Sequence, residues 1–154
     1  MEQVSLDTLV SHDGVVLWGL LGNVYRLIND RLHEDIHDAT GLDGSEFEFL
    51  LRLARFPAAR GMATRVGERM GFTSAGTTKL VARLERKGLI ERTRDPDDGR
   101  AYLVALSLRG ERLLRKGLTA HVPRLDDEVL GHLTPAQQRQ LHSLLSRLDP
   151  TLRP

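Results

Sequence analysis

Apolar residues recur at intervals of three and four positions along the first quarter of the chain. Between residues 14 and 37 they are Val16, Leu17, Leu20, Leu21, Val24, Leu27, Ile28, Leu32 and Ile36. This spacing predicts one long helix. In its first half the apolar positions cover more than the single face that a core contact needs, which indicates that a partner covers the rest.

Shorter helical patterns follow. Ser45 and Glu48 have the spacing of a capping box, and the helix that they begin ends before Pro57. Thr64 and Thr73 then begin two further helices, which are separated by a turn at Gly71, and the second ends at Gly88. Two helices joined by a tight turn predict a helix-turn-helix.

Two strand-like runs and two more helices complete the pattern. Residues 89–94 and 101–106 flank a segment, 95–100, rich in turn-forming residues. Ser107 begins a long helix that Pro123 is expected to kink or split, and Thr134-Pro135 with Gln137 begins the last helix. The predicted fold is mainly α: a winged helix-turn-helix with a two-stranded wing, flanked by long terminal helices. The expected regions are an N-terminal helical arm (1–40), a winged helix-turn-helix domain (41–107) and a C-terminal helical region (108–154).

Charge is unevenly distributed, although the formal net charge is only +1. Residues 1–59 contain 4 Lys/Arg and 10 Asp/Glu, whereas residues 60–100 contain 10 and 6. A basic middle segment predicts an anionic partner for the helix-turn-helix. The absence of cysteine excludes disulfides and zinc ribbons. No apolar run is long enough to cross a bilayer, so we expect a cytoplasmic protein without membrane contact.

The segment from Thr78 to Arg92, TKLVARLERKGLIER, and the segment from Asp95 to Ala101, DPDDGRA, carry a family resemblance. With Ser107 and Gly110 they resemble the recognition helix and wing of the MarR family, the multiple-antibiotic-resistance regulators. The resemblance implies a homodimeric transcriptional regulator, most simply a repressor, that binds inverted-repeat DNA and is released by a small ligand. A regulator that needs no ligand is the second reading.

The resemblance also points to the residues that meet DNA. The start of the recognition helix enters the major groove and the wing contacts the minor groove. Arg100 would be the minor-groove arginine, with its guanidinium oriented by Asp98, and Arg60, Arg65 and Arg69 would add phosphate contacts. The expected DNA-binding residues are Ser74, Gly76, Thr77, Thr78, Lys79, Arg83, Arg94, Asp98 and Arg100.

A ligand site is also expected from the resemblance, between the dimerisation helices and the winged motif. Trp18, Glu48 and Arg92 look like the positions used by the urate-type branch of the family. A Trp offers a stacking face, and an Arg offers two parallel hydrogen bonds to a carboxylate. Each also has a structural explanation, as dimer core, helix cap and surface ion pair respectively.

One motif suggests different chemistry. His33-Glu34-Asp35-Ile36-His37 matches the zinc-protease pattern H-E-x-x-H. A zinc-dependent hydrolase is a remote alternative, because the motif lacks a third ligand. A milder alternative is a regulatory metal held by His33 and His37 with Asp38 or His121. No phosphate loop or nucleophile elbow is present, so we expect no enzyme activity and no cofactor.

Overall fold

The computed structural model describes residues 4–95 and 102–148. Its helices are α1 (Leu6–Val10), α2 (Asp13–Thr40), α3 (Gly44–Ala54), α4 (Ala63–Arg69), α5 (Ser74–Arg86), α6 (Leu108–Glu128) and α7 (Pro135–Leu148). The strands are β1 (Arg60–Met62), β2 (Ile90–Arg94) and β3 (Tyr102–Leu106), and single 3₁₀ turns lie at Pro57–Ala59 and Leu130–His132.

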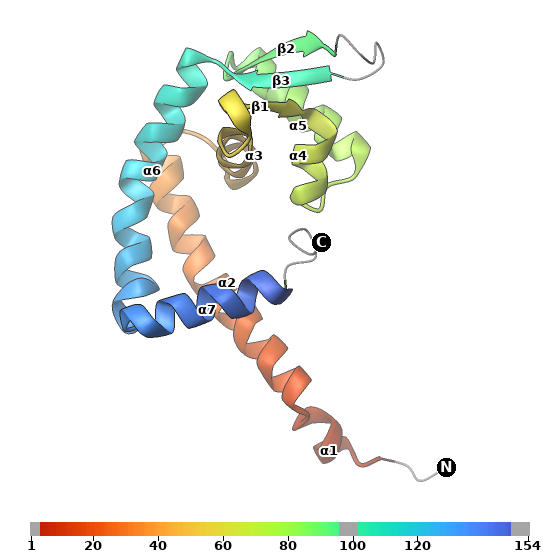
Figure 1. The fold of residues 1–154 in the computed structure, drawn as a ribbon, viewed down its shortest axis with the longest axis vertical. Coiled ribbons are helices and arrows are strands. Elements are labelled where there is room, and N and C mark those ends of the chain that lie inside the picture. Colours follow the sequence, from red (N-terminus) through yellow and green to blue (C-terminus); the bar gives the residue numbers. More distant parts are fainter. Residues whose placement is uncertain (1–3, 96–101, 149–154) are drawn as a thin grey trace.

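The winged motif forms around one apolar core. Helices α3, α4 and α5 pack beneath a three-stranded antiparallel sheet of order β1-β3-β2 (Figure 1). Phe49, Leu50, Leu53, Leu84 and Val104 are fully buried there. The predicted winged helix-turn-helix is therefore confirmed. The sequence pattern missed β1, because Arg-Gly-Met is too short to show the alternation of a strand.

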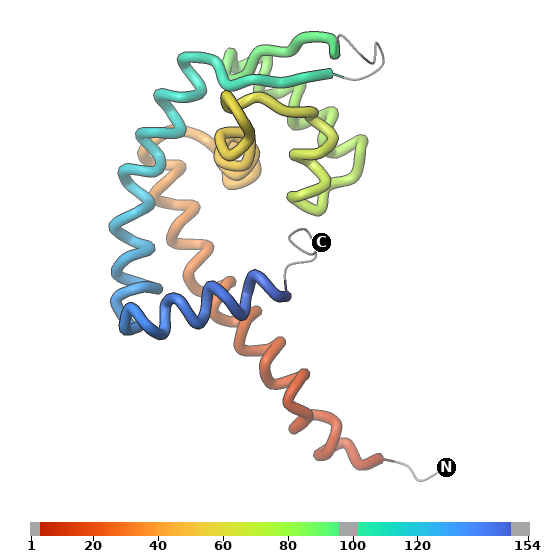
Figure 2. Tube along the Cα trace, in the orientation of Figure 1, coloured from red at the N-terminus to blue at the C-terminus, as the bar shows by residue number. Residues whose placement is uncertain are grey.

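The long helices form a separate layer beside this motif. The C-terminal half of α2 packs along α6, whereas the N-terminal half extends away from the winged motif (Figure 2). Ion pairs join the two helices, from Arg124 Nε to Asp35 Oδ2 (2.7 Å) and from Arg31 Nη1 to Glu128 Oε1 (2.8 Å). Helix α6 continues through Pro123 to Glu128, so the expected split is wrong. Packing against α2 outweighs the one hydrogen bond that proline cannot donate.

Two helix starts differ from those expected. Asp43, not Ser45, caps α3, and its capping-box partner is Glu46, not Glu48. Met62 precedes α4 without a side-chain cap, so Thr64 lies inside that helix. The other predicted caps are confirmed at Thr73, Ser107 and the Thr134–Gln137 pair, and Gly88 has the left-handed conformation expected after α5.

The Asp35–Arg124 pair makes a pH-dependent contribution to stability. The hydrogen bond and the charge of Arg124 outweigh desolvation and hold the pKa of Asp35 below its ordinary value. A carboxyl group with a lowered pKa stabilises the fold above its unfolded pKa, about 3.9, and this stabilisation is lost as pH falls through the folded pKa. Asp35→Asn should therefore lower stability at pH 7 and reduce the further loss between pH 5 and pH 2.

Urea unfolding at a series of pH values measures this effect, with Asp38→Asn as the control. Asp38 is an exposed acid on the same helix and forms no ion pair with another described residue. An unfolding midpoint whose pH dependence is the same in Asp35→Asn and the parent would contradict the assignment.

Candidate DNA-binding surface

Helix α5 has one buried side and one polar side. Thr77, Leu80, Val81 and Leu84 are buried against the motif's core. Ser74, Thr78, Lys79 and Arg86 are exposed, and Gly76 lies near the first turn. The hydroxyl of Thr73 accepts from the backbone N–H of Gly76 (3.1 Å), which fixes the start of the helix. A rigid helix start with small and polar side chains can approach base edges closely.

Thr77 does not belong to this exposed set, so its assignment to DNA is wrong. Its side chain is only 4% exposed. It packs against Gly67 of α4, where a Cβ atom would lie 2.0 Å from the Thr77 hydroxyl oxygen. Thr77 therefore lets the two helices of the helix-turn-helix approach each other. The Thr78 hydroxyl is exposed but donates to the carbonyl of Ser74 (2.9 Å), which leaves its oxygen free to accept.

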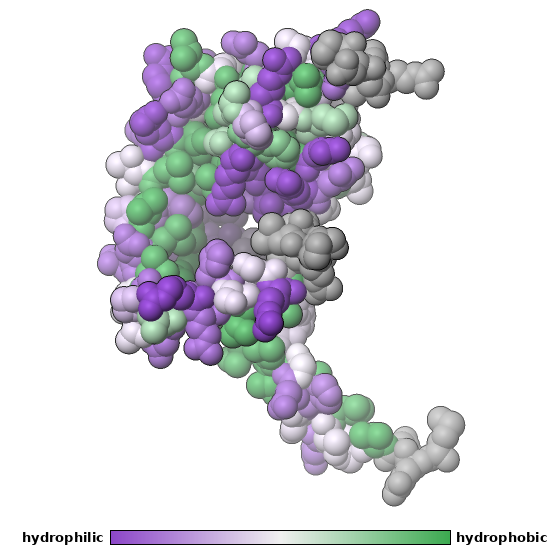
Figure 3. All heavy atoms as spheres, viewed as in Figure 1, coloured by the Kyte–Doolittle hydropathy of each residue, from purple (hydrophilic) through white to green (hydrophobic). Residues whose placement is uncertain are grey.

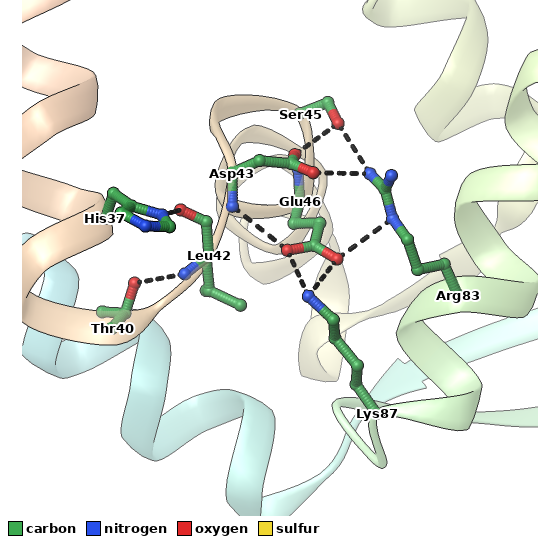
Figure 4. Close-up of polar contacts among 8 residues, drawn as sticks. All are labelled: His37, Thr40, Leu42, Asp43, Ser45, Glu46, Arg83 and Lys87. Carbon is green, nitrogen blue, oxygen red and sulfur yellow. Dashed lines mark hydrogen bonds and ion pairs between the residues drawn. The ribbon is translucent and has the colours of Figure 1, made fainter.

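Arg83 is also engaged within the protein rather than projecting freely toward DNA. Its Nη2 lies 2.9 Å from Asp43 Oδ2 and its Nε lies 3.0 Å from Glu46 Oε1 (Figure 4). The neighbouring cation Lys87 places its Nζ 2.6 Å from the same Glu46 oxygen. Burial alone would raise the pKa of Asp43, but hydrogen bonds from Ser45 and the Glu46 backbone, together with Arg83 and Lys87, lower it. The prediction for Arg83 missed these partners on α3.

The remaining cations of α4, α5 and the sheet divide into two groups. Arg92 stacks on Tyr102 with its guanidinium 3.5 Å from the ring centroid, and Arg69 lies over Phe56 at 4.8 Å. Arg60 donates to the Thr93 hydroxyl (3.2 Å). A second group forms no ion pair, ring contact or side-chain hydrogen bond with another described residue, and it consists of Arg65, Lys79, Arg86 and Arg94. All four of these side chains are exposed.

The wing is described only at its base. Arg94 ends β2 opposite Tyr102 of β3 and is exposed. Asp98 and Arg100 lie in residues 96–101, outside the described part of the chain, and their assignment to the minor groove stays a prediction.

The three expected ligand residues do not meet within one chain. Trp18 lines a groove of about 540 Å³ with Gly14, Leu17, Leu21, Leu145 and Leu148, between α2 and α7. Glu48 Oε1 lies 2.5 Å from Arg52 Nε on the same helix, and the Arg92 guanidinium stacks on the Tyr102 ring. The N-terminal half of α2 carries Trp18 away from the winged motif (Figure 1).

The histidines of the H-E-x-x-H motif have structural neighbours. His33 Nδ1 lies 3.3 Å from the Asn29 amide, and His37 Nδ1 lies 3.3 Å from the carbonyl of Leu42. His121 stacks edge-on against Phe47, and burial lowers its pKa despite the nearby charge of Asp35. Among residues 4–95 and 102–148, no three His, Asp or Glu side chains are grouped to hold a metal ion.

Comparison with known proteins agrees with this geometry. Residues 40–101 match the model of the MarR family. The regulator MhqR of Bacillus subtilis is 27% identical over 132 residues, covering 86% of this chain and 88% of MhqR. These matches support a MarR-family DNA-binding transcriptional regulator rather than an enzyme.

Solved MarR-family structures share the architecture over nearly the whole chain. Sco3205 of Streptomyces coelicolor, solved in complex with DNA, superposes with a TM-score of 0.80 at 24% identity, covering 99% of this chain and 95% of Sco3205. PcaV of the same organism, solved with its natural ligand, has a TM-score of 0.65 at 26% identity and covers 96% of both chains. Within the described residues, no helix has the length and apolar character needed to span a membrane.

Proposed function

We propose that this MarR-family regulator is a homodimeric repressor of inverted-repeat operators that a small anionic ligand releases from DNA. The observation that carries the proposal is the distribution of cations on α5 and β2. Lys79, Arg86 and Arg94 are exposed and form no ion pair with another described residue, so they are free to neutralise phosphates. Two such helices would enter successive major grooves about one helical turn apart.

Removal of one of these cations tests the proposal. Lys79→Ala should weaken binding to duplex DNA and reduce the slope of log affinity against log salt by about 0.9 per protomer, or about 1.8 per dimer. Helical structure should not change, because Lys79 is exposed on α5. Fluorescence anisotropy of a labelled duplex at several salt concentrations measures both quantities.

Lys116→Ala is the matched control, since Lys116 is an exposed lysine on α6, on the opposite side of the molecule from α4 and α5 (Figure 1). Equal salt slopes for Lys79→Ala, Lys116→Ala and the parent protein would remove α5 from the DNA contact.

The homodimer is supported by the exposed surface of a single chain. One chain exposes 11247 Å², whereas a compact monomer of 17.3 kDa exposes about 7,800 Å². Much of the excess is apolar. Twelve of the eighteen large apolar side chains exposed in the described part of the chain lie within residues 4–27, a segment that contains α1 and the N-terminal half of α2 (Figure 3). Residues 1–40 and 108–154 would form the dimer, and residues 41–107 would bind DNA.

The proposal of an effector rests on the chemistry of Trp18, Glu48 and Arg92, because these residues do not form one site within a single chain. Trp18 is 76% exposed, which leaves its ring available for stacking. Because α2 carries Trp18 away from its own winged motif, a cleft with Glu48 and Arg92 would require Trp18 of the partner subunit. PcaV, which was solved with its natural ligand, supports this part of the proposal. A ligand would release DNA only if it bound more tightly to a dimer whose α5 helices no longer match the groove spacing.

A further inference from the structure

Three cations follow one another at four-residue intervals along α5 and its C-cap. Lys79, Arg83 and Lys87 therefore share one face of the helix. Ion pairs divide this face into two parts. Lys79, in the N-terminal half, pairs with no described residue, whereas Arg83 and Lys87 are both bound by acids of α3.

The acids are held in place before any DNA arrives. Asp43 and Glu46 form the capping box of α3, with the Glu46 backbone N–H donating to Asp43 Oδ1 (2.8 Å) and the Asp43 N–H donating to Glu46 Oε2 (3.1 Å). The Glu46 side chain is only 1% exposed. A fully buried carboxylate requires nearby cations, because a lone buried charge is strongly destabilising.

The cations meet these acids through several contacts (Figure 4). Lys87 Nζ donates to Glu46 Oε2 (2.8 Å) and lies 2.6 Å from Oε1. Arg83 Nη2 lies 2.9 Å from Asp43 Oδ2 and donates to the Ser45 hydroxyl (3.0 Å). The planar Arg83 guanidinium is thus held through Nη2 and Nε by Asp43, Ser45 and Glu46.

We propose that Asp43 and Glu46 set the DNA specificity of this regulator by withholding Arg83 and Lys87 from phosphates. Non-specific affinity depends on how many phosphates a protein neutralises, whereas specific affinity also depends on base contacts. If Arg83 and Lys87 are neutralised from within, Lys79 and Arg86 are the α5 cations left to attract DNA, and Lys79 lies in the N-terminal half of the helix, where base edges are read. The inference rests on the proposed role of α5 as the recognition helix.

Glu46→Gln tests this inference, because Gln still accepts the Asp43 N–H but carries no charge. We expect the salt slope on a scrambled duplex to steepen by about 0.9 for each cation released in each protomer. We also expect the ratio of affinities for a selected duplex and its scrambled version to fall. The double variant Glu46→Gln/Arg83→Gln should return part of the slope to that of the parent.

Glu111→Gln is the matched control. It also removes one glutamate charge and frees an arginine, Arg115, but this arginine is on α6 and not on α5. The slope and the affinity ratio should stay at parent values in Glu111→Gln. If Glu46→Gln does not fold, as judged by circular dichroism, Asp43→Asn is measured instead, since Asn retains the N-cap.

Two results would overturn the inference. One is a folded Glu46→Gln protein with the slope and affinity ratio of Glu111→Gln. The other is an equal loss of affinity for both duplexes at unchanged slope, which would show that the ion pairs only support the fold. A failure of the recognition-helix assignment itself would appear separately, as a Lys79→Ala protein that binds both duplexes like the parent.

Discussion

Replacing Leu144 and Leu145 of α7 with glutamate is expected to convert the protein to monomers that no longer bind an inverted-repeat duplex tightly. These side chains are 49% and 42% exposed in a single chain, and Leu145 lines the groove that contains Trp18. Covering the exposed half of a leucine contributes about 1 kcal/mol, so four leucines in a dimer contribute about 4 kcal/mol. The dimer dissociation constant should rise at least about a thousandfold.

Sedimentation equilibrium measures the dissociation constant, and Trp18 gives an independent signal. It is the only tryptophan of the chain, so its emission should shift to the red when a partner no longer covers it. Arg139→Glu is the control, because it also changes the charge of α7 by two units at an exposed position. Dimers of unchanged strength in Leu144→Glu/Leu145→Glu would place the interface elsewhere.

Gly110→Ala adds one methyl group between the wing and α6. We expect it to lower the stability of the fold more than any other single methyl group added there. A Cβ atom at residue 110 would lie 2.0 Å from the carbonyl oxygen of Leu89 and 3.0 Å from its carbonyl carbon. Leu89 is buried, and its carbonyl also accepts from the Ser107 N–H (3.1 Å), so the backbone there cannot move without losing contacts. The cost should reach or exceed about 3 kcal/mol, the upper part of the range for overpacked sites.

Thermal and urea unfolding measure this cost, with Arg109→Ala as the control at an exposed neighbouring residue. The loss should be accompanied by weaker DNA binding, since Gly110 sits where α6 joins the winged motif. A Gly110→Ala protein as stable as Arg109→Ala would show that the start of α6 can shift away from Leu89.

Local patterns in the sequence predicted most of the fold. Apolar spacing and caps at Thr73, Ser107 and Thr134 act within one or two helical turns, so they are visible in a single sequence. The cap of α3 was placed wrongly because Asp43–Glu46 and Ser45–Glu48 have the same spacing. The distinction comes from Gly41, whose left-handed conformation ends α2 and leaves Asp43 as the first residue free to cap.

The candidate site was less predictable, because it depends on contacts between distant segments. The sequence shows a cationic face on α5 but not that Asp43 and Glu46 lie against Arg83. Two positions in the sequence nevertheless indicate such contacts. Thr77 has the same spacing as the apolar Leu80, Val81 and Leu84, which indicates burial. Glu46 likewise lies on the stripe of Leu50 and Leu53, where a charge requires partners.

Selection of bound duplexes from a random DNA pool, followed by a salt titration of the enriched sequence, tests the central claim most directly. The account predicts an inverted repeat with half-sites about one helical turn apart. It also predicts a steep loss of affinity with salt that Lys79→Ala reduces by about 1.8 units of slope per dimer. A pool without an enriched sequence, or a selected duplex bound no better than random DNA, would contradict the account of α5 as a sequence-reading helix.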